Sequence, residues 1–532
     1  MIKQTNVYTF ATLSDIAGGR KYSEEEIKGL IQNLSLGGIL VILSQMGSFG
    51  AEDPRVRKLF FKYLNDLGLE ELSGAFKNHV LYSEQGLLML WKWIFAHGIQ
   101  DSLSASVNPV LGINQIIHLC ISISDYLYDQ VPEEEAKYYI FSNVVFNNKA
   151  DLGSDLARAL LIFDEIAKDR RNFTEKEFID IHSAFSETYG YTIREYLAVV
   201  FGLISSFFVS SDSKSILNPN WNKSSNFFEN IQNPALGEAI LNELSMSFSE
   251  ASSWSQNNFD KPWDFTKFRQ KPLLRLDNGN FYPISLRFLF DKVLSELYFK
   301  IREAFPRDNT QVISFFGRCF EKYLEISTGK SLEVRKRNPY IFIPEFSYGK
   351  KRSNRSPDVM LRLGDTLLAV EAKVYRLKMN SLFGNKESID EDTQRIAVEP
   401  IIQLHKRLSE LQALSHPMIK GVSKIYLMSV TFGDFPTLKP FEEKISQSIG
   451  TFKLPVKGCF HLDIEEYEML MELLSRNSSA PIFAYLDNKQ QLGPHMSFKN
   501  FLFASHLHPR RPRFTRERMF EHLQGLKTTL FQ

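Results

Sequence analysis

Residues 356–373, SPDVMLRLGDTLLAVEAK, contain two short strand patterns separated by Gly364 and Asp365. A glycine in the first position of a two-residue loop favours a tight β-hairpin, and so short a loop fixes the register of both strands. Leu363 then faces Thr366, and the other facing pairs follow by counting outward. This constrains the fold strongly, because a slip of one residue would turn every side chain to the opposite face of the sheet.

Two acidic residues and a lysine lie within these otherwise apolar strands. In the expected register Asp358 lies opposite Glu371, and Lys373 lies two residues further along on the same side. Opposed residues have Cβ atoms about 5 Å apart, where two like charges are destabilising. A divalent cation would remove this conflict, because Mg²⁺ typically binds one or two carboxylates. The remaining strand residues are expected to face a core: Val359, Leu361, Leu368 and Val370.

The sequence Pro-Asp, the hairpin turn and Glu-Ala-Lys together resemble the signature of the PD-(D/E)xK nuclease superfamily, which has the restriction-endonuclease-like fold. The neighbouring segments match the α-β-β-β-α-β order of that fold over about residues 305–435. The segments are a helix at 310–328, a strand at 338–346, the hairpin, a helix at 392–414 interrupted by Pro400, and a strand at 423–433. The resemblance predicts an α/β domain with a mixed sheet.

The resemblance also implies a catalytic site that holds Mg²⁺ or Mn²⁺. Asp358, Glu371 and the backbone carbonyl of Ala372 would bind the metal, and Lys373 would assist the attacking water. The segment GRCFE resembles a G-x-x-F-E pattern, in which the helix glutamate reaches the metal. This makes Glu321 the fourth candidate ligand, against the alternative that it is an ordinary solvated helix residue; Glu325, one turn further on, is the reserve candidate.

One residue on the later helix departs from a pattern found in part of the superfamily. Gln403 matches the glutamine of a Q-x-x-x-Y arrangement that supports the site in exonuclease-like branches. Here Arg407 stands where that arrangement has tyrosine. Gln403 is therefore a candidate site residue, whereas the tyrosine typical of the exonuclease-like branch is replaced by arginine.

Two basic segments are candidate contacts to a nucleic-acid backbone. The first precedes the hairpin and contains Lys350, Lys351, Arg352 and Arg355. The second, at 506–518 near the C-terminus, contains Arg510, Arg511, Arg513, Arg516 and Arg518, with Phe514 among them. Basic side chains bind phosphates without reading sequence, and an interleaved aromatic residue suits base stacking. The alternatives are a solubilising loop for the first segment and an intramolecular contact to an acidic face for the second.

The rest of the chain indicates a multidomain protein with a mainly α N-terminal half. Ser23 with Glu26 and Thr174 with Glu177 match the capping box that opens helices. An Asn-Gly turn within 271–285 predicts a β-hairpin, and 287–305 predicts a connecting helix. We expect three segments: an all-α domain at 1–255, the hairpin and connecting helix at 256–305, and the nuclease-like domain at 306–532.

The composition and the cysteine pattern limit where the protein is expected to work and what it is expected to bind. The formal net charge of +1 gives no overall attraction to nucleic acid or membrane, so any such affinity must be local. The three cysteines form no C-x-x-C pair, which is typical of a reducing cytoplasm. The N-terminus has no signal-peptide pattern. The most apolar run, 197–210, is shorter than the roughly 20 residues that span a bilayer and predicts a core helix.

These features favour a cytoplasmic, metal-dependent nuclease that hydrolyses DNA phosphodiester bonds. Defence of a prokaryotic cell against foreign DNA is the expected setting, by analogy with the fold class. The helical half would regulate the enzyme by oligomerising or by docking a protein partner. The alternative is a catalytically silent nuclease-fold protein that acts as a nucleic-acid-binding or scaffold module, and an RNA substrate also stays open.

Overall fold

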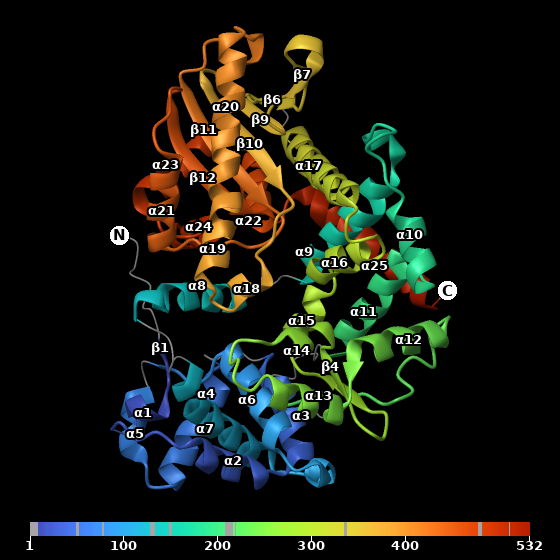
Figure 1. The fold of residues 1–532 in the computed structure, drawn as a ribbon, viewed down its shortest axis with the longest axis vertical. Helices are drawn as coiled ribbons and strands as arrows, with labels where there is room; N and C mark the ends of the chain where they lie inside the picture. The colour runs from blue at the N-terminus through green and yellow to red at the C-terminus, as the bar shows by residue number, and fades with distance from the viewer. Residues whose placement is uncertain are drawn as a thin grey trace. The chain divides into compact units, whose positions relative to one another are not determined.

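The computed structural model describes residues 9–16, 18–48, 53–76, 79–127, 133–147, 152–207, 216–218, 220–334, 338–476, 481–509 and 511–531. The chain is mainly helical, and its mixed sheet lies in the C-terminal half (Figure 1). It divides into two compact units. The sheet unit contains Lys137–Arg194 and Leu294–Leu526, and the helical unit contains Thr5–Ala136, Glu195–Val293 and Lys527–Gln532.

This division differs from the three consecutive segments expected from the sequence. Residues 137–194 lie within the expected all-α domain, yet they belong to the sheet unit. They do so because Phe163 and Phe173 pack against Phe316 and Phe315 of the helix at 310–333. Such contacts join residues far apart in the sequence, and no local pattern reveals them.

The helical unit contains small sheets as well as helices. Its elements are β1 (Thr9–Phe10), α1 (Leu13–Ile16), α2 (Glu24–Gln32), α3 (Leu36–Met46), α4 (Pro54–Asp66), α5 (Glu70–Ala75), β2 (His79–Val80), α6 (Glu84–His97), α7 (Pro109–Leu127), α11 (Ile193–Phe207), α12 (Pro234–Leu244), β3 (Ser245–Met246), α13 (Phe248–Asn257), α14 (Thr266–Gln270), β4 (Leu273–Arg275), β5 (Phe281–Pro283) and α15 (Leu286–Asp291). The predicted hairpin is confirmed as β4–β5, and β3 pairs with β4. The expected all-α domain therefore includes short strands.

Two helix predictions have different outcomes. The capping box at Ser23 and Glu26 is confirmed at the start of α2. At Thr174 the Glu177 side chain accepts the expected hydrogen bonds, but the segment is a turn, and α10 (Ile181–Tyr189) begins only after its own cap, Asp180. The predicted connecting helix is divided between α15 and α16 (Ser295–Glu303).

One described helix, Pro109–Leu127, is long and apolar enough to span a membrane, and 72% of its apolar window is buried inside the structure. The bent pair α2 and α3 passes the same test only if the two helices are counted as one span. The apolar run that begins at residue 197 lies in α11 and is largely buried, as expected for a core helix. Its last three residues lie outside the described part of the chain.

The sheet unit is built around a five-stranded mixed sheet in the order β12-β11-β10-β9-β6. Its elements are α8 (Ala136–Asn147), α9 (Leu152–Ala159), α10, α16, α17 (Thr310–Glu333), β6 (Ile341–Pro344), β7 (Ser347–Tyr348), β8 (Asn354–Arg355), β9 (Val359–Leu363), β10 (Thr366–Lys373), α18 (Met379–Leu382), α19 (Lys386–Thr393), α20 (Glu399–Ala413), β11 (Lys424–Thr431), α21 (Lys439–Ile449), β12 (Val456–Asp463), α22 (Ile464–Ser475), α23 (Ile482–Leu492), α24 (Phe498–Ala504) and α25 (Arg513–Phe531). Strands β6, β9 and β10 are antiparallel neighbours, whereas β10, β11 and β12 run parallel.

The predicted hairpin register is confirmed along the whole β9–β10 ladder. Leu363 pairs with Thr366 and Val359 pairs with Val370, and the loop glycine Gly364 has a φ of 60°. Both faces of the hairpin are buried. Helix α20 covers the face that includes Met360, Leu367 and Ala369, and α17 and α22 lie on the other face (Figure 1).

A buried ion pair holds the inserted segment 137–194 to the rest of the sheet unit. Arg158 of α9 donates two hydrogen bonds of 2.9 Å to Glu468 of α22, and the two side chains are only 4% and 2% exposed. Tyr323 of α17 donates its hydroxyl to the same carboxylate. Asp155 accepts a further bond of 2.8 Å from Arg158. One network thus connects three helices that lie far apart in the sequence.

Candidate active site

Asp358 directly precedes β9, at the point where the regular pairing of β9 with β10 stops. The Asp358 N–H donates to the carbonyl of Val370, 3.1 Å away, although Val370 is the ladder partner of Val359. This offset resembles a β-bulge, which re-aims a side chain. The Asp358 carboxylate consequently accepts a hydrogen bond of 2.7 Å from the N–H of Ala372. The expected direct opposition of Asp358 and Glu371 is thus not part of the ladder.

Three carboxylates from separate elements converge beside this point. One oxygen from each of Glu321, Glu345 and Asp358 lies within 4.8 Å of the other two. Glu321 comes from α17, Glu345 directly follows β6, and Asp358 precedes β9. We call these three residues the carboxylate cluster. Sequence reasoning identified Asp358 and Glu321 but missed Glu345.

The pairing of β6 with β9 explains why Glu345 lies beside Asp358. Ile341 pairs with Arg362 and Pro344 with Val359, so the next pair in this register is Glu345 with Asp358. The residues between the two strands, 345–358, form no two-residue turn that would fix this pairing in advance. The pairing was therefore visible only in the folded sheet.

Burial and crowding of charge raise two pKa values in the cluster. Burial, together with the nearby charges of Glu371 and Glu321, raises the pKa of Asp358 well above its usual range. Burial raises the pKa of Glu321 to about 7, and Glu345 and Glu371 act in the same direction against the opposing effect of Arg318. Both carboxyls therefore hold protons more tightly than in the unfolded chain. A cation bound here would have to displace those protons.

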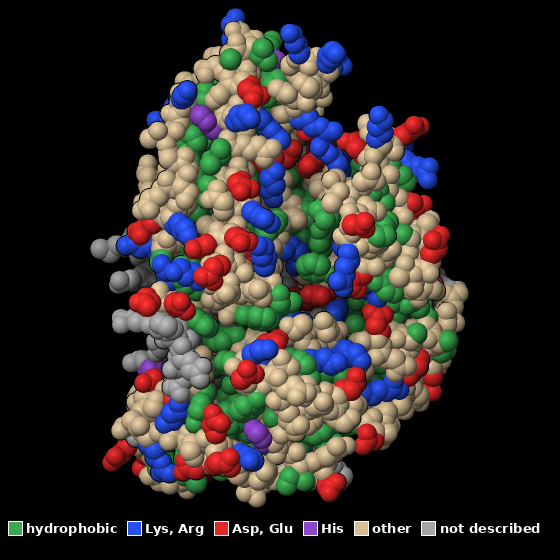
Figure 2. All heavy atoms as spheres, in the orientation of Figure 1, with side chains coloured by type: hydrophobic (Ala, Val, Ile, Leu, Met, Phe, Trp, Pro, Cys, Tyr) green, Lys and Arg blue, Asp and Glu red, His purple; other side chains and the backbone are tan. Residues whose placement is uncertain are grey.

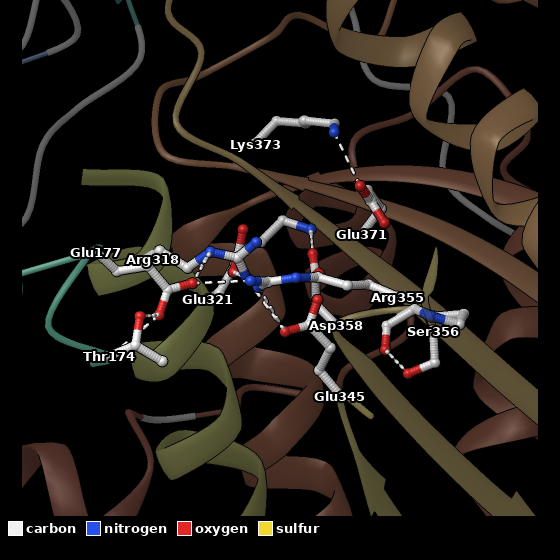
Figure 3. A network of polar contacts seen from close by, with 12 residues as sticks. Thr174, Glu177, Arg318, Glu321, Glu345, Arg355, Ser356, Asp358, Glu371 and Lys373 are labelled. Carbon is white, nitrogen blue, oxygen red and sulfur yellow. Dashed lines mark hydrogen bonds and ion pairs between the residues drawn. The ribbon is translucent and has the colours of Figure 1, made fainter. Parts of the chain in front are cut away.

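Glu371 and Lys373 lie next to the cluster but have other partners. Glu371, 2% exposed, accepts bonds from Lys373, 2.8 Å away, and from Arg407 of α20. Lys373 also donates to Gln403, 3.0 Å away. In Figure 3 the Glu371 carboxylate points toward Lys373. The structure thus brings Gln403 to Lys373, and it shows that Arg407, at the position of the departure from Q-x-x-x-Y, is an ion-pair partner of Glu371.

Ala372 contributes its backbone at the same place. Its N–H donates to Asp358, and a strand residue directs its N–H and C=O toward the same neighbouring strand. The Ala372 carbonyl therefore opens toward the side of β10 on which Asp358 lies. This orientation is compatible with the expected role of the carbonyl as a ligand.

Two arginines cover the carboxylate cluster. Arg318 of α17 pairs with Glu321 and with Glu345, the latter at 3.1 Å, and Arg355 of β8 pairs with Glu345 at 3.2 Å. Arg355 also pairs at 2.8 Å with Glu177, from the turn before α10. Figure 3 shows both guanidinium groups between the carboxylates of Glu177 and Glu345. Arg355 was expected to bind nucleic acid, but here its partners are acidic side chains of the same unit.

The Glu177 carboxyl is ionised at neutral and mildly acidic pH. Burial by itself would raise its pKa, but hydrogen bonds from Arg355 and Thr174 outweigh this effect and lower the pKa to about 2. The hydrogen bond to Glu177 correspondingly raises the pKa of Arg355. The contact is therefore one between full charges.

The cluster lines a small cavity of about 130 Å³. The charged residues of its wall are Glu177, Glu321, Glu325, Glu345, Asp358, Arg318, Lys322 and Arg355. Five of these side chains are acidic and three are basic, so acidic groups are in excess, and the wall becomes negatively charged once Glu321 and Asp358 lose their protons. Asp358 is 6% exposed, and its described hydrogen bond engages only one of its two carboxylate oxygens. A partly buried, oxygen-rich site with an excess of acidic groups fits Mg²⁺ or Mn²⁺.

The other described basic residues that were expected to contact nucleic acid do not line the cavity of the carboxylate cluster. Lys350, Lys351 and Arg352 form the exposed tip between β7 and β8, and the last two have a φ of 56°. Figure 2 shows Lys and Arg side chains gathered beside acidic ones where α17, β6 and β7 lie in Figure 1. Arg511 lines a separate cavity with Glu468 and Phe520, and Arg513 pairs with Glu517 at 2.7 Å. Arg510 lies outside the described residues.

No family model matches the chain, and searches of curated proteins and of solved structures gave no match.

Proposed function

We propose that the sheet unit is a metal-dependent nuclease of the PD-(D/E)xK type with a restriction-endonuclease-like fold. The observation that carries the proposal is the convergence of Glu321, Glu345 and Asp358 within 4.8 Å, beside the Glu371–Lys373 pair. The order α17, β6, β9, β10, α20 and β11 in a mixed sheet supports the fold. We propose DNA as the substrate, a cytoplasmic location, and defence of a prokaryotic cell against foreign DNA, the last by analogy with the fold class.

The proposed chemistry assigns a task to each residue. Glu321, Glu345 and Asp358 would hold the Mg²⁺ or Mn²⁺ ion, with Glu371 and the Ala372 carbonyl as further ligands. When bound, the ion supplies a Lewis acid for a phosphate oxygen and lowers the pKa of a water molecule. Lys373 is held by Glu371 and Gln403, and would orient the attacking water or accept its proton. Arg407 fixes the Glu371 carboxylate from the α20 side.

A cleavage assay tests this function. Linear, circular and single-stranded DNA and an RNA of the same sequence are incubated with the protein in Mg²⁺, in Mn²⁺ and in EDTA. We expect cleavage of at least one DNA substrate with either metal and none in EDTA. Cleavage in EDTA would contradict the proposed metal dependence, and cleavage of RNA alone would replace DNA as the substrate.

Glu345 provides a test of the metal site that needs no catalysis. Mn²⁺ binding is measured by calorimetry. We expect Glu345→Gln to lower the affinity for Mn²⁺ about 10- to 100-fold, the range known for residues that support a metal site. Glu387→Gln, an exposed carboxylate on α19, is the matched control and should bind as the parent does. Equal affinity of the Glu345→Gln and Glu387→Gln variants would exclude Glu345 as a ligand.

The same titration carries a pH signature. Because the pKa values of Glu321 and Asp358 are raised, the metal competes with protons below the folded-state pKa and binds freely above it. The affinity should therefore rise between about pH 6 and pH 8, with release of protons on binding. An affinity that is flat over this range would mean that the Glu321 carboxyl is not a ligand.

A second candidate function is a catalytically silent module that binds nucleic acid or a protein partner. The observation that favours it is the pairing of Arg318 and Arg355 with the cluster, since the arginines already neutralise part of its charge. The helical unit is then a candidate surface for oligomerisation or for a partner. Absence of Mn²⁺ binding by the parent would select this function over the nuclease.

A further inference from the structure

The two arginines and two of the glutamates form a closed ring of alternating charges. Oε1 of Glu177 lies 2.8 Å from Arg355 and 3.6 Å from Arg318, and Oε2 of Glu345 lies 3.2 Å and 3.1 Å from the same two side chains. Glu345 belongs to the carboxylate cluster, so it forms the inner member of the ring. Glu177 forms the outer member.

Glu177 is held in this position by its own turn. Its Oε2 accepts hydrogen bonds from the N–H and the hydroxyl of Thr174, at 3.1 and 2.8 Å, which leaves Oε1 for the arginines. The turn itself is anchored on α17, because Phe173 and Phe178 both contact the ring of Phe315. The inserted segment therefore presents one fixed anionic oxygen to a pair of guanidinium groups.

A single anionic oxygen bridging two guanidinium groups is also how a phosphodiester would be bound. Arginine presents a planar fork of donors that matches carboxylate and phosphate alike. Arg318 and Arg355 remain 26% and 41% exposed, so a larger anion can reach them. The exposed basic tip at Lys350–Arg352 lies just before the strand that carries Arg355.

We propose that Arg318 and Arg355 are the binding pair for a nucleic-acid phosphodiester, and that the Glu177 carboxylate occupies their phosphate position in the free protein. This inference rests on the proposed nuclease function. A phosphate that replaces Glu177 would lie directly beside Glu345 and the rest of the carboxylate cluster, which is where a reacting phosphate has to be. Glu177 then acts as an internal competitor that lowers the affinity for nucleic acid until substrate displaces it.

Glu177→Gln is the decisive variant. Glutamine has the same shape and can still accept the bonds from Thr174, but it carries no charge to hold the arginines. Glu175→Gln, an exposed glutamate in the same turn, is the matched control for net charge. Binding of a short fluorescein-labelled DNA duplex is followed by fluorescence anisotropy in EDTA, so that cleavage plays no part.

We expect Glu177→Gln to bind the duplex roughly 3- to 10-fold more tightly than Glu175→Gln, the range that one or two partly exposed ion pairs supply. Adding Arg318→Gln or Arg355→Gln to the Glu177→Gln variant should remove this gain. Glu177→Asp, whose carboxylate is one methylene shorter, should change affinity in the same direction as Glu177→Gln and serves if the glutamine variant does not fold.

Equal affinity of the Glu177→Gln and Glu175→Gln variants would overturn this inference, whether or not the parent cleaves DNA. A gain that survives removal of either arginine would overturn it as well. If Glu177→Gln binds the duplex more tightly but the parent does not cleave DNA in Mg²⁺, the result would support Arg318 and Arg355 as the binding pair and contradict the catalytic function. The binding and cleavage assays therefore separate the two proposals.

Discussion

Asp358→Asn and Lys373→Ala should abolish DNA cleavage while leaving the protein folded. Loss of the Asp358 charge removes the most buried member of the carboxylate cluster, and we expect at least about a 10³-fold fall in rate, on the scale of losing a preorganised electrostatic group. Loss of Lys373 removes the proposed proton acceptor, and such a group typically raises the reaction rate about 10²- to 10⁴-fold. The measurement is the initial rate of cleavage of linear DNA in Mg²⁺.

Thermal unfolding distinguishes lost chemistry from lost structure. The folded-state pKa of Asp358 is raised, so its proton stabilises the folded protein at low pH, and this contribution is lost as pH rises through the folded pKa. Above that pH the parent keeps a disfavoured buried charge, which asparagine lacks. Without metal at alkaline pH, Asp358→Asn should therefore melt at the same temperature as the parent or higher.

Matched controls come from the exposed start of α19. Glu387→Gln and Lys386→Ala remove one charge each at exposed positions and should cleave as the parent does. If Asp358→Asn or Lys373→Ala cleaves DNA as fast as these controls, the assigned active site is wrong.

Arg158→Ala should cause the largest loss of stability among the described ion pairs of the inserted segment. Truncating one partner of a buried pair leaves the other charge without compensation, which typically costs about 3–5 kcal/mol. Here the stranded group is Glu468, whose side chain is 2% exposed and also binds Tyr323. The free energy of unfolding, from urea denaturation followed by circular dichroism, should fall accordingly.

Arg171→Ala is the control for this prediction. Arg171 lies in the same inserted segment and pairs with Asp169, but its side chain is 89% exposed, so its removal should change little. The double variant Arg158→Leu/Glu468→Leu should recover part of the lost stability, because it removes the buried charge of Glu468 and leaves only Asp155 without its partner. Equal stability of Arg158→Ala and Arg171→Ala would mean that the network does not hold the segment in place.

The sequence by itself determined what short-range geometry controls. The two-residue loop at Gly364 and Asp365 fixed the β9–β10 register, because so short a connection permits one pairing. The motif resemblances singled out Glu321 and Gln403 as candidate site residues, and the structure brings Glu321 to Asp358 and Gln403 to Lys373. Each of these features depends on neighbours along the chain or on one tight turn.

Only the tertiary structure decided the rest of the candidate site. Glu345 reaches Asp358 through a strand pairing that no short loop fixes, and Glu177 reaches Arg355 because aromatic side chains pack the inserted segment against α17. The offset at Asp358 likewise removes it from ladder opposition to Glu371, and its carboxylate lies with those of Glu345 and Glu321. Such contacts depend on which surfaces bury each other in the folded chain, and that choice is made by the summed packing of the whole unit, with no local pattern to record it.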